Sequence, residues 1–420
     1  MEKMLLNMIK NGKNNICMTI LLIKGKHMKV SSIDIKGIAG IKSLELNFND
    51  GINIICGTNG IGKTTILECI ATTFLSGSIS LKRNSQCSKG IVNTYVLCNS
   101  IKNNLSYETT NFEPITDNTH YNTSLLNMSK EVLYLKPHRN ISYNSLQSIN
   151  KDPIRTLHNQ FYYSHNVIMG ISGDDIKNWL INRYLFYDKA GSISTEQKYN
   201  YELSTKCFSI LDENIKFKTV IGSTFEILLD TNKGDIYFEY LSAGYKSVIH
   251  ILLGLIKEIE YRINNPFIKA NDFEGIILID EIDVHLHPHW QSKLVQALKE
   301  IFPKAQIIAT THSPTILQNL EENEIIELEE DPNNGVRVKE LNLGDYGLKG
   351  WSVEEILTDV MGLTSTSSAL YQETLQNFDS ALNEEDSEKI MHYFNVLDKM
   401  LHPNNPLRKL FKIQVAEWEE

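Results

Sequence analysis

The sequence predicts an α/β fold in which a parallel core sheet carries a glycine-rich loop. First, an apolar run leads directly into a loop with Gly57, Gly60 and Gly62, and a helical pattern follows. Second, two further apolar runs, at residues 275–279 and 306–310, are each followed by polar side chains. Short apolar runs of this kind are typical of parallel strands buried on both faces. The carboxyl ends of such strands meet in one crevice, so we expect the loop and the polar residues to lie close together.

The composition is that of an ordinary soluble globular protein. Of the 420 residues, 42% are hydrophobic and 22% are charged, which leaves room for about two or three subdomains. The net charge of −10 argues against a protein that coats nucleic acid. However, residues 321–420 alone hold 22 acidic and 8 basic side chains, so the rest of the chain is slightly basic and can still bind DNA. The six cysteines include no C-x-x-C pair, which is the usage of a reducing, cytoplasmic compartment.

The N-terminal part of the chain contains an extension and two strand patterns. Residues 1–27 form the extension, and its apolar run at 16–23 is too short to span a bilayer, so we expect no membrane segment. Residues 30–36 and 44–48 alternate apolar and polar side chains, with a turn between them. Alternation with a period of two predicts half-buried strands. We therefore expect two N-terminal antiparallel strands ahead of the glycine loop.

Helical patterns dominate the middle of the chain. Apolar residues with helical spacing predict a helix directly after the loop, from about Ile66. Residues 76–130 are rich in Ser, Asn and Thr, and there we expect loops and short strands, followed by a buried strand at 131–135. From about residue 150 to 215 the spacing is helical again, which predicts a helical insertion between two halves of the domain that contains the core sheet. A small antiparallel ribbon is expected next, at 217–240.

The C-terminal half supplies polar residues at the ends of apolar patterns. Ser242 and Gly244 stand at the start of a helical pattern, where a serine taken alone is most simply a helix cap. The two apolar runs noted above lead into Asp280 and Glu281 and into His312. These patterns divide the chain into five parts. The main domain, which contains the core sheet, is predicted in two parts at 28–149 and 233–330, separated by the insertion and ribbon at 150–232. An extension at 1–27 precedes it, and an acidic helical tail at 331–420 follows it.

The glycine loop has the pattern of a phosphate-binding loop, G-x-x-x-x-G-K-[ST]. Its glycines allow successive backbone N–H groups and the start of the following helix to point at one anion. In such a loop the lysine reaches the outer phosphates and the next hydroxyl binds Mg²⁺. The alternative is a surface loop rich in Gly, Asn and Thr that matches the pattern by chance. The residues of the predicted site are Gly57, Asn59, Gly60, Ile61, Gly62, Lys63, Thr64 and Thr65.

Four stretches together, residues 57–65, 241–247, 280–281 and 311–312, resemble the ABC-type P-loop ATPases of the SMC, RecF and Rad50 branch. Residues 280–288 and 350–363 are similar to the small bacterial AAA ATPases of defence islands, notably the ATPase subunit of Septu-type anti-phage systems. The first resemblance covers roughly residues 28–330 apart from the insertion. Its motifs stand in the expected context, because the glycine loop lies between a predicted strand and a predicted helix. It implies an ABC-type P-loop NTPase fold with a helical insertion and a helical C-terminal tail.

The resemblance also implies roles for individual residues. Lys63 and the loop amides would hold the β- and γ-phosphates of ATP, and Thr64 with Asp280 would hold Mg²⁺. Glu281 would be the general base that orients water, and His312 the residue that senses the γ-phosphate. A further pair, Ser242 and Gly244, would contact the γ-phosphate bound to a second copy. A homodimer or higher homo-oligomer is therefore expected.

The sequence departs from the family pattern at two places. Gln147 is the candidate for the family's glutamine ahead of the insertion, although its surroundings do not single it out. Tyr245 and Lys246 replace the glycine and glutamine that are commoner in the signature of transporters. The alternate histidines within residues 285–289 allow a second interpretation, because such spacing can chelate Zn²⁺. Nothing nearby supplies a third and fourth ligand, so a place at the dimer interface is favoured.

The tail predicts two amphipathic helices, at residues 371–382 and 390–401. They either dock a partner or cover the protein's own core. No D-x-D nuclease pattern follows His312, so an effector activity would come from a partner. For a Septu-like system the resemblance implies an HNH nuclease. Two other functions remain open at this point: a RecF- or Rad50-like DNA-repair ATPase without a nuclease partner, and a nucleotide sensor in which turnover is incidental.

Overall fold

The computed structural model describes most of the chain. All but one residue of the expected N-terminal extension, and part of the expected insertion, lie outside the described residues. The chain divides into two compact units, one up to Ile356 and the other from Leu357 onward. The described residues are 27–74, 81–113, 126–139, 143, 145–153, 169–341, 343–344 and 346–416.

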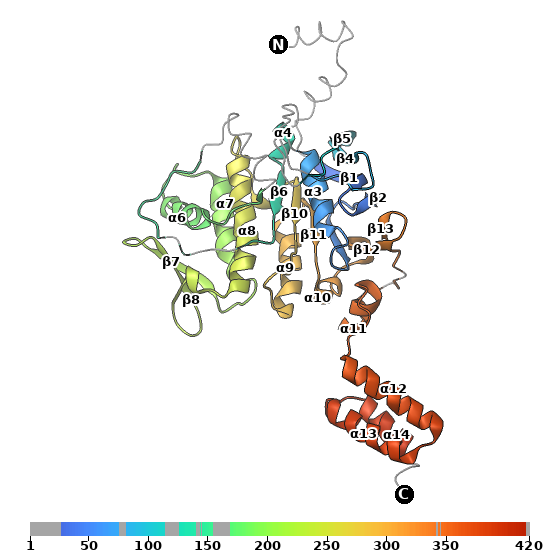
Figure 1. Ribbon diagram of the computed structural model, residues 1–420. Coiled ribbons are helices and arrows are strands. Elements are labelled where there is room, and N and C mark those ends of the chain that lie inside the picture. Colours follow the sequence, from blue (N-terminus) through green and yellow to red (C-terminus); the bar gives the residue numbers. More distant parts are fainter. Residues whose placement is uncertain are drawn as a thin grey trace. The chain divides into compact units, whose positions relative to one another are not determined.

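A six-stranded sheet forms the centre of the first unit (Figure 1). Its strands are β3 (Ile52–Gly57), β6 (Val132–Leu135), β10 (Ile276–Ile279), β11 (Gln306–Thr310), β12 (Ile325–Asp331) and β13 (Gly335–Val338). Their order is β13-β12-β3-β11-β10-β6, and all neighbours pair in parallel except β12 and β13. Every residue of β3, β6, β10 and β11 is buried, which explains why these strands are mostly apolar in the sequence. The predicted parallel core sheet is confirmed.

A four-stranded antiparallel sheet carries the N-terminal strands. It contains β1 (Met28–Ile38), β2 (Ile41–Asn47), β4 (Gly90–Cys98) and β5 (Ile101–Thr109), in the order β2-β1-β4-β5. Helix α3 (Lys63–Thr73) follows the glycine loop, and its Ile66 and Ile70 share one apolar core with Ile33 of this sheet and Ile308 of the core sheet. The loop is therefore anchored on both sides by buried structure, and the predicted N-terminal strands are confirmed.

The insertion contains the helices α6 (Ile176–Phe186) and α7 (Thr195–Cys207), which contact α8 (Ala243–Arg262) beyond the β6 edge of the core sheet (Figure 1). A three-stranded antiparallel ribbon lies beside them, formed by β7 (Lys216–Ile221), β8 (Glu226–Asp230) and β9 (Ile236–Tyr237). The predicted helical insertion is confirmed. Within the described parts of the chain, no helix is long and apolar enough to cross a membrane.

Shorter elements complete the first unit and lead out of it. Helices α9 (Pro288–Ile301) and α10 (Pro314–Leu317) follow the strands β10 and β11. Both begin with a proline, whose missing N–H is not needed at a helix start. The remaining short elements are α4 (Leu126–Ser129), η3 (Phe238–Tyr240), η4 (Ala270–Asp272), η5 (Glu322–Glu324), α11 (Val353–Glu355) and η6 (Ile356–Val360).

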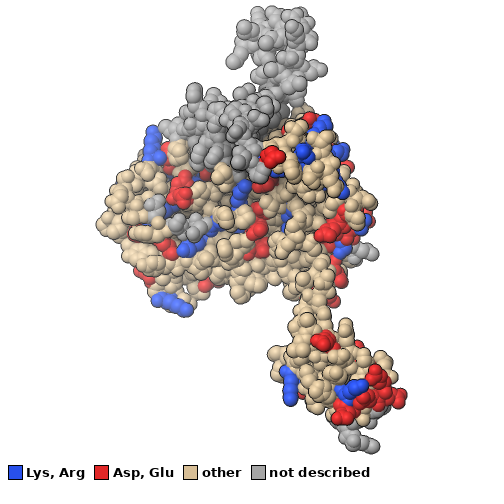
Figure 2. Space-filling model, viewed as in Figure 1, with Lys and Arg blue, Asp and Glu red and all other residues tan. Residues whose placement is uncertain are grey.

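The second unit consists of α12 (Ala369–Glu384), α13 (Ser387–Met400) and α14 (Leu407–Val415). Phe378, Ile390, Leu397 and Phe411 form the centre of its own apolar core. The apolar stripes predicted at 371–382 and 390–401 therefore pack against each other and against α14, and the predicted tail helices are confirmed. The tail begins later than the predicted residue 331, because residues 335–338 form β13 of the core sheet. Acidic side chains gather on one side of this unit (Figure 2).

Candidate active site

The glycine loop turns the chain sharply between β3 and α3. The φ angles of Gly57, Gly60 and Gly62 are 135°, 79° and 106°, in a region that L side chains rarely adopt. At Gly57 a side chain would also collide with β12, because its Cβ would lie 2.4 Å from the carbonyl oxygen of Leu328. Glycine is required at this position both by backbone conformation and by the close approach of the neighbouring strand.

The start of α3 concentrates positive charge and backbone donors. Lys63 is buried, and this burial lowers the pKa of its ammonium group. Its Nζ donates hydrogen bonds to the carbonyl oxygens of Gly57 (2.9 Å) and Thr58 (2.8 Å). Gly62 caps the helix without a side-chain hydrogen bond, and the first turn holds no acidic residue. The first amides of the helix are thus available to an anion, with a lysine beside them.

The other predicted loop residues differ in exposure. Asn59 is exposed and Thr65 is half-buried, whereas Ile61 is buried in the apolar core. A bound anion can therefore meet the backbone of Ile61 but not its side chain. The side chain instead holds the loop against the sheets.

Thr64 and Asp280 meet at the carboxyl edge of the core sheet. The Thr64 hydroxyl lies 3.1 and 2.9 Å from the two carboxylate oxygens of Asp280 and donates to them. Thr310, at the end of β11, donates from its hydroxyl to Asp280 Oδ1 at 2.6 Å. Asp280 is buried. A hydroxyl and a carboxylate that were 216 positions apart in the sequence are therefore in direct contact.

Glu281 is held through its backbone. Its φ of 48° is left-handed, an unusual conformation for a residue other than glycine. Its amide donates to the Thr310 hydroxyl at 2.7 Å, and its carbonyl accepts from Arg139 Nη2 at 3.0 Å. Arg139 also donates to the carbonyl of Asp280. The carboxylate of Glu281 takes no part in these contacts and is half-buried.

Arg139 and Asp283 are site residues that the sequence alone did not reveal. Burial lowers the pKa of the Arg139 guanidinium to about 10, so the group stays charged at neutral pH. Asp283 Oδ1 accepts from the hydroxyl of Thr311 at 2.5 Å and from the amide of His312 at 3.1 Å. Arg139 and Asp283 thus both form hydrogen bonds with backbone atoms of other site residues. The only signal in the sequence was their position just after apolar runs.

His312 follows β11 and is half-buried. Burial lowers the pKa of its imidazole, and the nearby charge of Lys63 lowers it further, against the opposite effect of Asp283. The imidazole is therefore neutral at pH 7. The charges of Lys63 and Glu281 both influence the imidazole of His312, so the three side chains lie close enough to interact electrostatically.

Ser242 and Gly244 begin α8, away from these contacts. Ser242 is exposed, and its hydroxyl accepts from the amide of Tyr245 at 3.3 Å as a helix cap. Gly244 packs against the turn after Glu281, since a Cβ there would lie 2.5 Å from the carbonyl oxygen of His285. Within the described residues no hydrogen bond joins Ser242 to the glycine loop. The structure therefore brings the glycine loop, the acidic pair after β10 and His312 to one edge of the core sheet, whereas the signature serine and glycine lie outside these hydrogen bonds.

Gln147 and the alternate histidines lie outside the contacts of the site. Gln147 lines a cavity at the ribbon, discussed below. The amide of His289 donates to His287 Nδ1 at 3.3 Å, and His285 is exposed. Among the described residues there is no group of three or more His, Cys, Asp or Glu side chains that could hold a metal ion.

Comparison with known proteins identifies the class of this chain and then its family. Residues 52–318 match the family model described as "AAA domain, putative AbiEii toxin, Type IV TA system", so the chain is an AAA-domain protein. It is 47% identical over 392 residues to the Septu protein PtuA of Bacillus thuringiensis, across 93% of this chain and 98% of that protein. The chain therefore belongs to the Septu PtuA family.

More distant similarities are recorded as well. The chain is 26% identical to the Septu protein PtuA of Bacillus mycoides (strain KBAB4), across 92% of this chain but 52% of that relative. Among solved structures, an SMC head bound to the C-winged helix domain of ScpA matches with a TM-score of 0.40 and 15% identity, across 74% of this chain and 97% of that one.

Proposed function

We propose that this chain binds ATP and Mg²⁺, hydrolyses ATP in a site completed by a second copy, and thereby controls an associated HNH nuclease in anti-phage defence. The proposal rests on the contact between the Thr64 hydroxyl and both oxygens of Asp280, at 3.1 and 2.9 Å. This contact joins the glycine loop to the strand that leads into Glu281. It is the arrangement that phosphoryl transfer from a nucleoside triphosphate requires.

The donor set fits a magnesium-bound triphosphate. A hydroxyl and a carboxylate are hard oxygen ligands, which Mg²⁺ prefers. Bound Mg²⁺ would neutralise charge that develops on the β- and γ-phosphate oxygens. Lys63 currently donates to the carbonyl oxygens of Gly57 and Thr58, so its ammonium is already directed at the inside of the loop. The uncapped first turn of α3 adds backbone donors for the same anion.

The remaining residues have distinct parts in the proposed reaction. Glu281 orients a water molecule and accepts its proton, because its carboxylate is free of the contacts that hold its backbone. His312 is neutral, so it donates one hydrogen bond without adding charge. Arg139 and Asp283 are positioning residues, since they act through the backbone of Asp280, Glu281 and His312.

In this proposal, Ser242 is the residue that a second copy contributes to the site. This residue is exposed at the N-terminus of a 20-residue helix, where the helix dipole and free amides favour an anion. In the proposed dimer Ser242 and Gly244 of one copy meet the γ-phosphate held by Lys63 of the other. ATP therefore acts as part of the interface, and its hydrolysis releases the two copies.

The nuclease partner and the DNA target follow from the family resemblance. The decisive experiment is to purify the chain with the products of its neighbouring genes and to measure DNA cleavage with and without ATP and Mg²⁺. We expect ATP hydrolysis by the chain, co-purification of a small HNH protein, and cleavage that depends on nucleotide. Absence of ATP hydrolysis with Mg²⁺ present, by the chain alone and with its neighbours, would contradict the proposal.

A further inference from the structure

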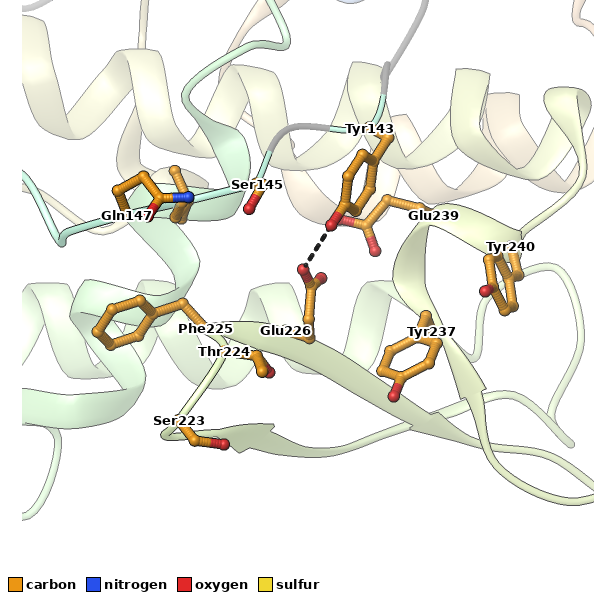
Figure 3. Close-up of a pocket in the computed structure, with 11 residues that line it drawn as sticks. Tyr143, Ser145, Gln147, Ser223, Thr224, Phe225, Glu226, Tyr237, Glu239 and Tyr240 are labelled. Carbon is orange, nitrogen blue, oxygen red and sulfur yellow. Dashed lines mark hydrogen bonds between the residues drawn. The ribbon is translucent and has the colours of Figure 1, made fainter.

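A cavity of about 700 Å³ lies between the β7–β8 hairpin and the short helix η3 that leads into α8 (Figure 3). Its wall combines aromatic rings with carboxylates. Tyr143 and Glu226 point toward each other across it, and the tyrosines of β9 and η3 stand on one side (Figure 3). The residues that matter here are Tyr143, Phe225, Glu226, Tyr237, Glu239 and Tyr240.

Two carboxylates of this wall share one lysine side chain as their ion-pair partner. Glu226 and Glu239 both contact Lys177, whose Nζ lies 2.6 Å from Glu239 Oε1. All three side chains are buried, with 13%, 6% and 5% of their surface exposed, respectively. Burial disfavours the charged form of Lys177, but its hydrogen bonds to the two carboxylates outweigh this and raise its pKa. Lys177 thus faces two carboxylates, while a second ammonium, that of Lys246, donates to the backbone carbonyl oxygen of Glu239 at 3.2 Å.

One carboxylate oxygen in this cluster also lacks a donor. Glu239 Oε2 is buried and has no hydrogen-bond partner within the described part of the structure. A buried carboxylate oxygen without a donor is costly, because it has lost water and gained nothing in its place. The site is therefore more stable when a further positive donor approaches it.

The aromatic residues supply the second half of a cation site. The rings of Tyr237 and Tyr240 lie 5.5 Å apart in an edge-to-face arrangement, and Tyr240 is 72% exposed. Tyr143 already shows both kinds of contact: its hydroxyl donates to Glu226 at 3.3 Å, and its ring lies 5.4 Å from Lys177 Nζ. Aromatic faces attract cations, most strongly where water is partly excluded.

We propose that this cavity binds an arginine or lysine side chain of a partner polypeptide. A phosphate or other anion would face two carboxylates, and an uncharged apolar ligand would leave the buried oxygen of Glu239 without a donor. A bare metal ion is not favoured, since no set of metal ligands occurs among the described residues. A basic side chain has an apolar stem for the tyrosines and a charged head for the carboxylates.

The cavity adjoins the start of α8. Glu239 and Tyr240 belong to η3, and Ser242 follows two residues later. Lys246 on the first turns of α8 donates to the carbonyl oxygen of Glu239 at 3.2 Å. A ligand that moves η3 therefore moves the N-terminus of α8. An effect on hydrolysis through Ser242 rests on the proposed function, whereas binding of the basic side chain does not.

The test uses the full chain and a short capped peptide with two arginines, compared with the same peptide carrying citrulline, which is similar in shape but uncharged. Binding is measured by titration calorimetry. Glu226→Gln removes one of the two carboxylates of the cavity wall, and we expect roughly tenfold weaker binding of the arginine peptide. Tyr240→Ala, at an exposed position, should weaken it several-fold.

Asp235→Asn is the matched control. Asp235 is on the same ribbon, but it pairs with Lys218 at 2.6 Å and does not line the cavity, so binding should be unchanged. Equal binding of the two peptides, or wild-type binding by both Glu226→Gln and Tyr240→Ala, would overturn the proposal. If Glu226→Gln fails to fold, Tyr240→Ala decides alone. Peptide binding by a chain that hydrolyses no ATP would refute the proposed function and leave this inference intact.

Discussion

At the scale of single residues, the proposed catalytic group is separable from the contacts that hold it. Glu281 is fixed by its amide and carbonyl, through Thr310 and Arg139. We therefore expect Glu281→Gln to keep its fold and its ATP affinity while hydrolysis falls by roughly 10²- to 10⁴-fold, the usual contribution of a general base. Steady-state phosphate release and equilibrium ATP binding measure the two effects. Turnover at the wild-type rate in this variant would remove Glu281 from its role.

Replacement of Arg139 should lower stability as well as hydrolysis, because its hydrogen bonds hold the backbone of the site. Arg139→Met leaves the carbonyl oxygen of Asp280 without its donor and that of Glu281 with only the amide of Val284 as a donor among the described residues, at a cost of roughly 1–3 kcal/mol in the free energy of unfolding. Hydrolysis should fall as well, since both carboxylates lose their position. Urea unfolding measures the first effect. A comparison with Glu281→Gln, which should lose hydrolysis but not stability, separates positioning from chemistry.

His250 predicts a pH dependence of stability. Burial lowers the pKa of this α8 imidazole to about 4 from an ordinary value of 6.5, helped by the charges of Lys257 and Arg139 and opposed by a hydrogen bond with the carbonyl of Ile171. Between these values the unfolded chain binds more protons than the folded one. The contribution of His250 is therefore present above pH 6.5 and is lost as the pH falls toward 4, by roughly 3 kcal/mol in total.

Urea unfolding at a series of pH values tests this dependence. Wild-type stability should fall as the pH decreases through 6, and the same decrease should be smaller in His250→Gln, which has no titrating group. An equal pH dependence in both proteins would show that His250 does not contribute. Other groups that titrate in the same range act on both proteins alike, so the difference between the two curves isolates this imidazole.

At the scale of elements, buried strands and strands with clear alternation were predictable, whereas a mostly polar strand was not. The core strands are mostly apolar because both faces are covered, so β3, β10 and β11 stood out in the sequence despite polar residues such as Asn53 and Gln306. By contrast, β5 buries only Leu105 and Thr109, and its polar residues give it the composition of a loop. Its pairing with β4 comes from tertiary structure, which local pattern does not encode.

Some residues of the site were also predictable from the sequence, whereas others were not. The glycine loop was predictable because its chemistry requires fixed residue types at fixed spacing. Arg139 and Asp283 were not, because they stabilise backbone atoms of residues far away in the sequence. Many residue types can donate to a carbonyl, so no motif marks the one that does.

At the junction of β3 with α3, we predict that a side chain at Gly57 strongly destabilises the fold. Gly57→Ala would place a Cβ 2.4 Å from the carbonyl of Leu328 and force a φ of 135° on alanine, so we expect a large loss of stability, of about 3 kcal/mol or more. Gly60→Ala is the matched control: its φ is 79°, but nothing lies within 4 Å of the added Cβ, so the cost should stay near 1 kcal/mol. Thermal unfolding compares the two variants. Equal losses would show that the approach of β12 does not matter.

At the scale of the whole molecule, the fold separates two compact units with separate cores. The apolar faces of α12 and α13 are buried within the second unit, so the stripes that suggested docking in the sequence serve its own packing. Partner contacts therefore have to use other surfaces. Two such surfaces are present in the described residues. One is the exposed apolar side of α14 in the second unit, with Leu410 (54% exposed) and Ile413 (71% exposed), and the other is the cavity at the ribbon in the first unit.

The proposed dimer makes the last prediction. Ser242 is exposed in a single copy and contacts no residue of the glycine loop by a hydrogen bond in the described structure, whereas Lys63 lies within that loop. Lys63→Ala should therefore abolish ATP binding by the monomer. Ser242→Arg should leave monomer binding intact but prevent ATP-dependent dimerisation, because a bulky cation would occupy the interface in place of a hydroxyl.

Light scattering with ATP, in the Glu281→Gln background that prevents hydrolysis, measures the oligomeric state directly. Because Ser242 also caps α8, its replacement by arginine costs about 1 kcal/mol of helix stability irrespective of any interface. Ser242→Asn is the control for this effect, since asparagine caps a helix as well as serine does and is close to it in size. We expect Ser242→Asn to dimerise and Ser242→Arg to stay monomeric with ATP bound. Loss of ATP binding by monomeric Ser242→Arg would place the serine in the site of its own copy and exclude a site shared between two copies.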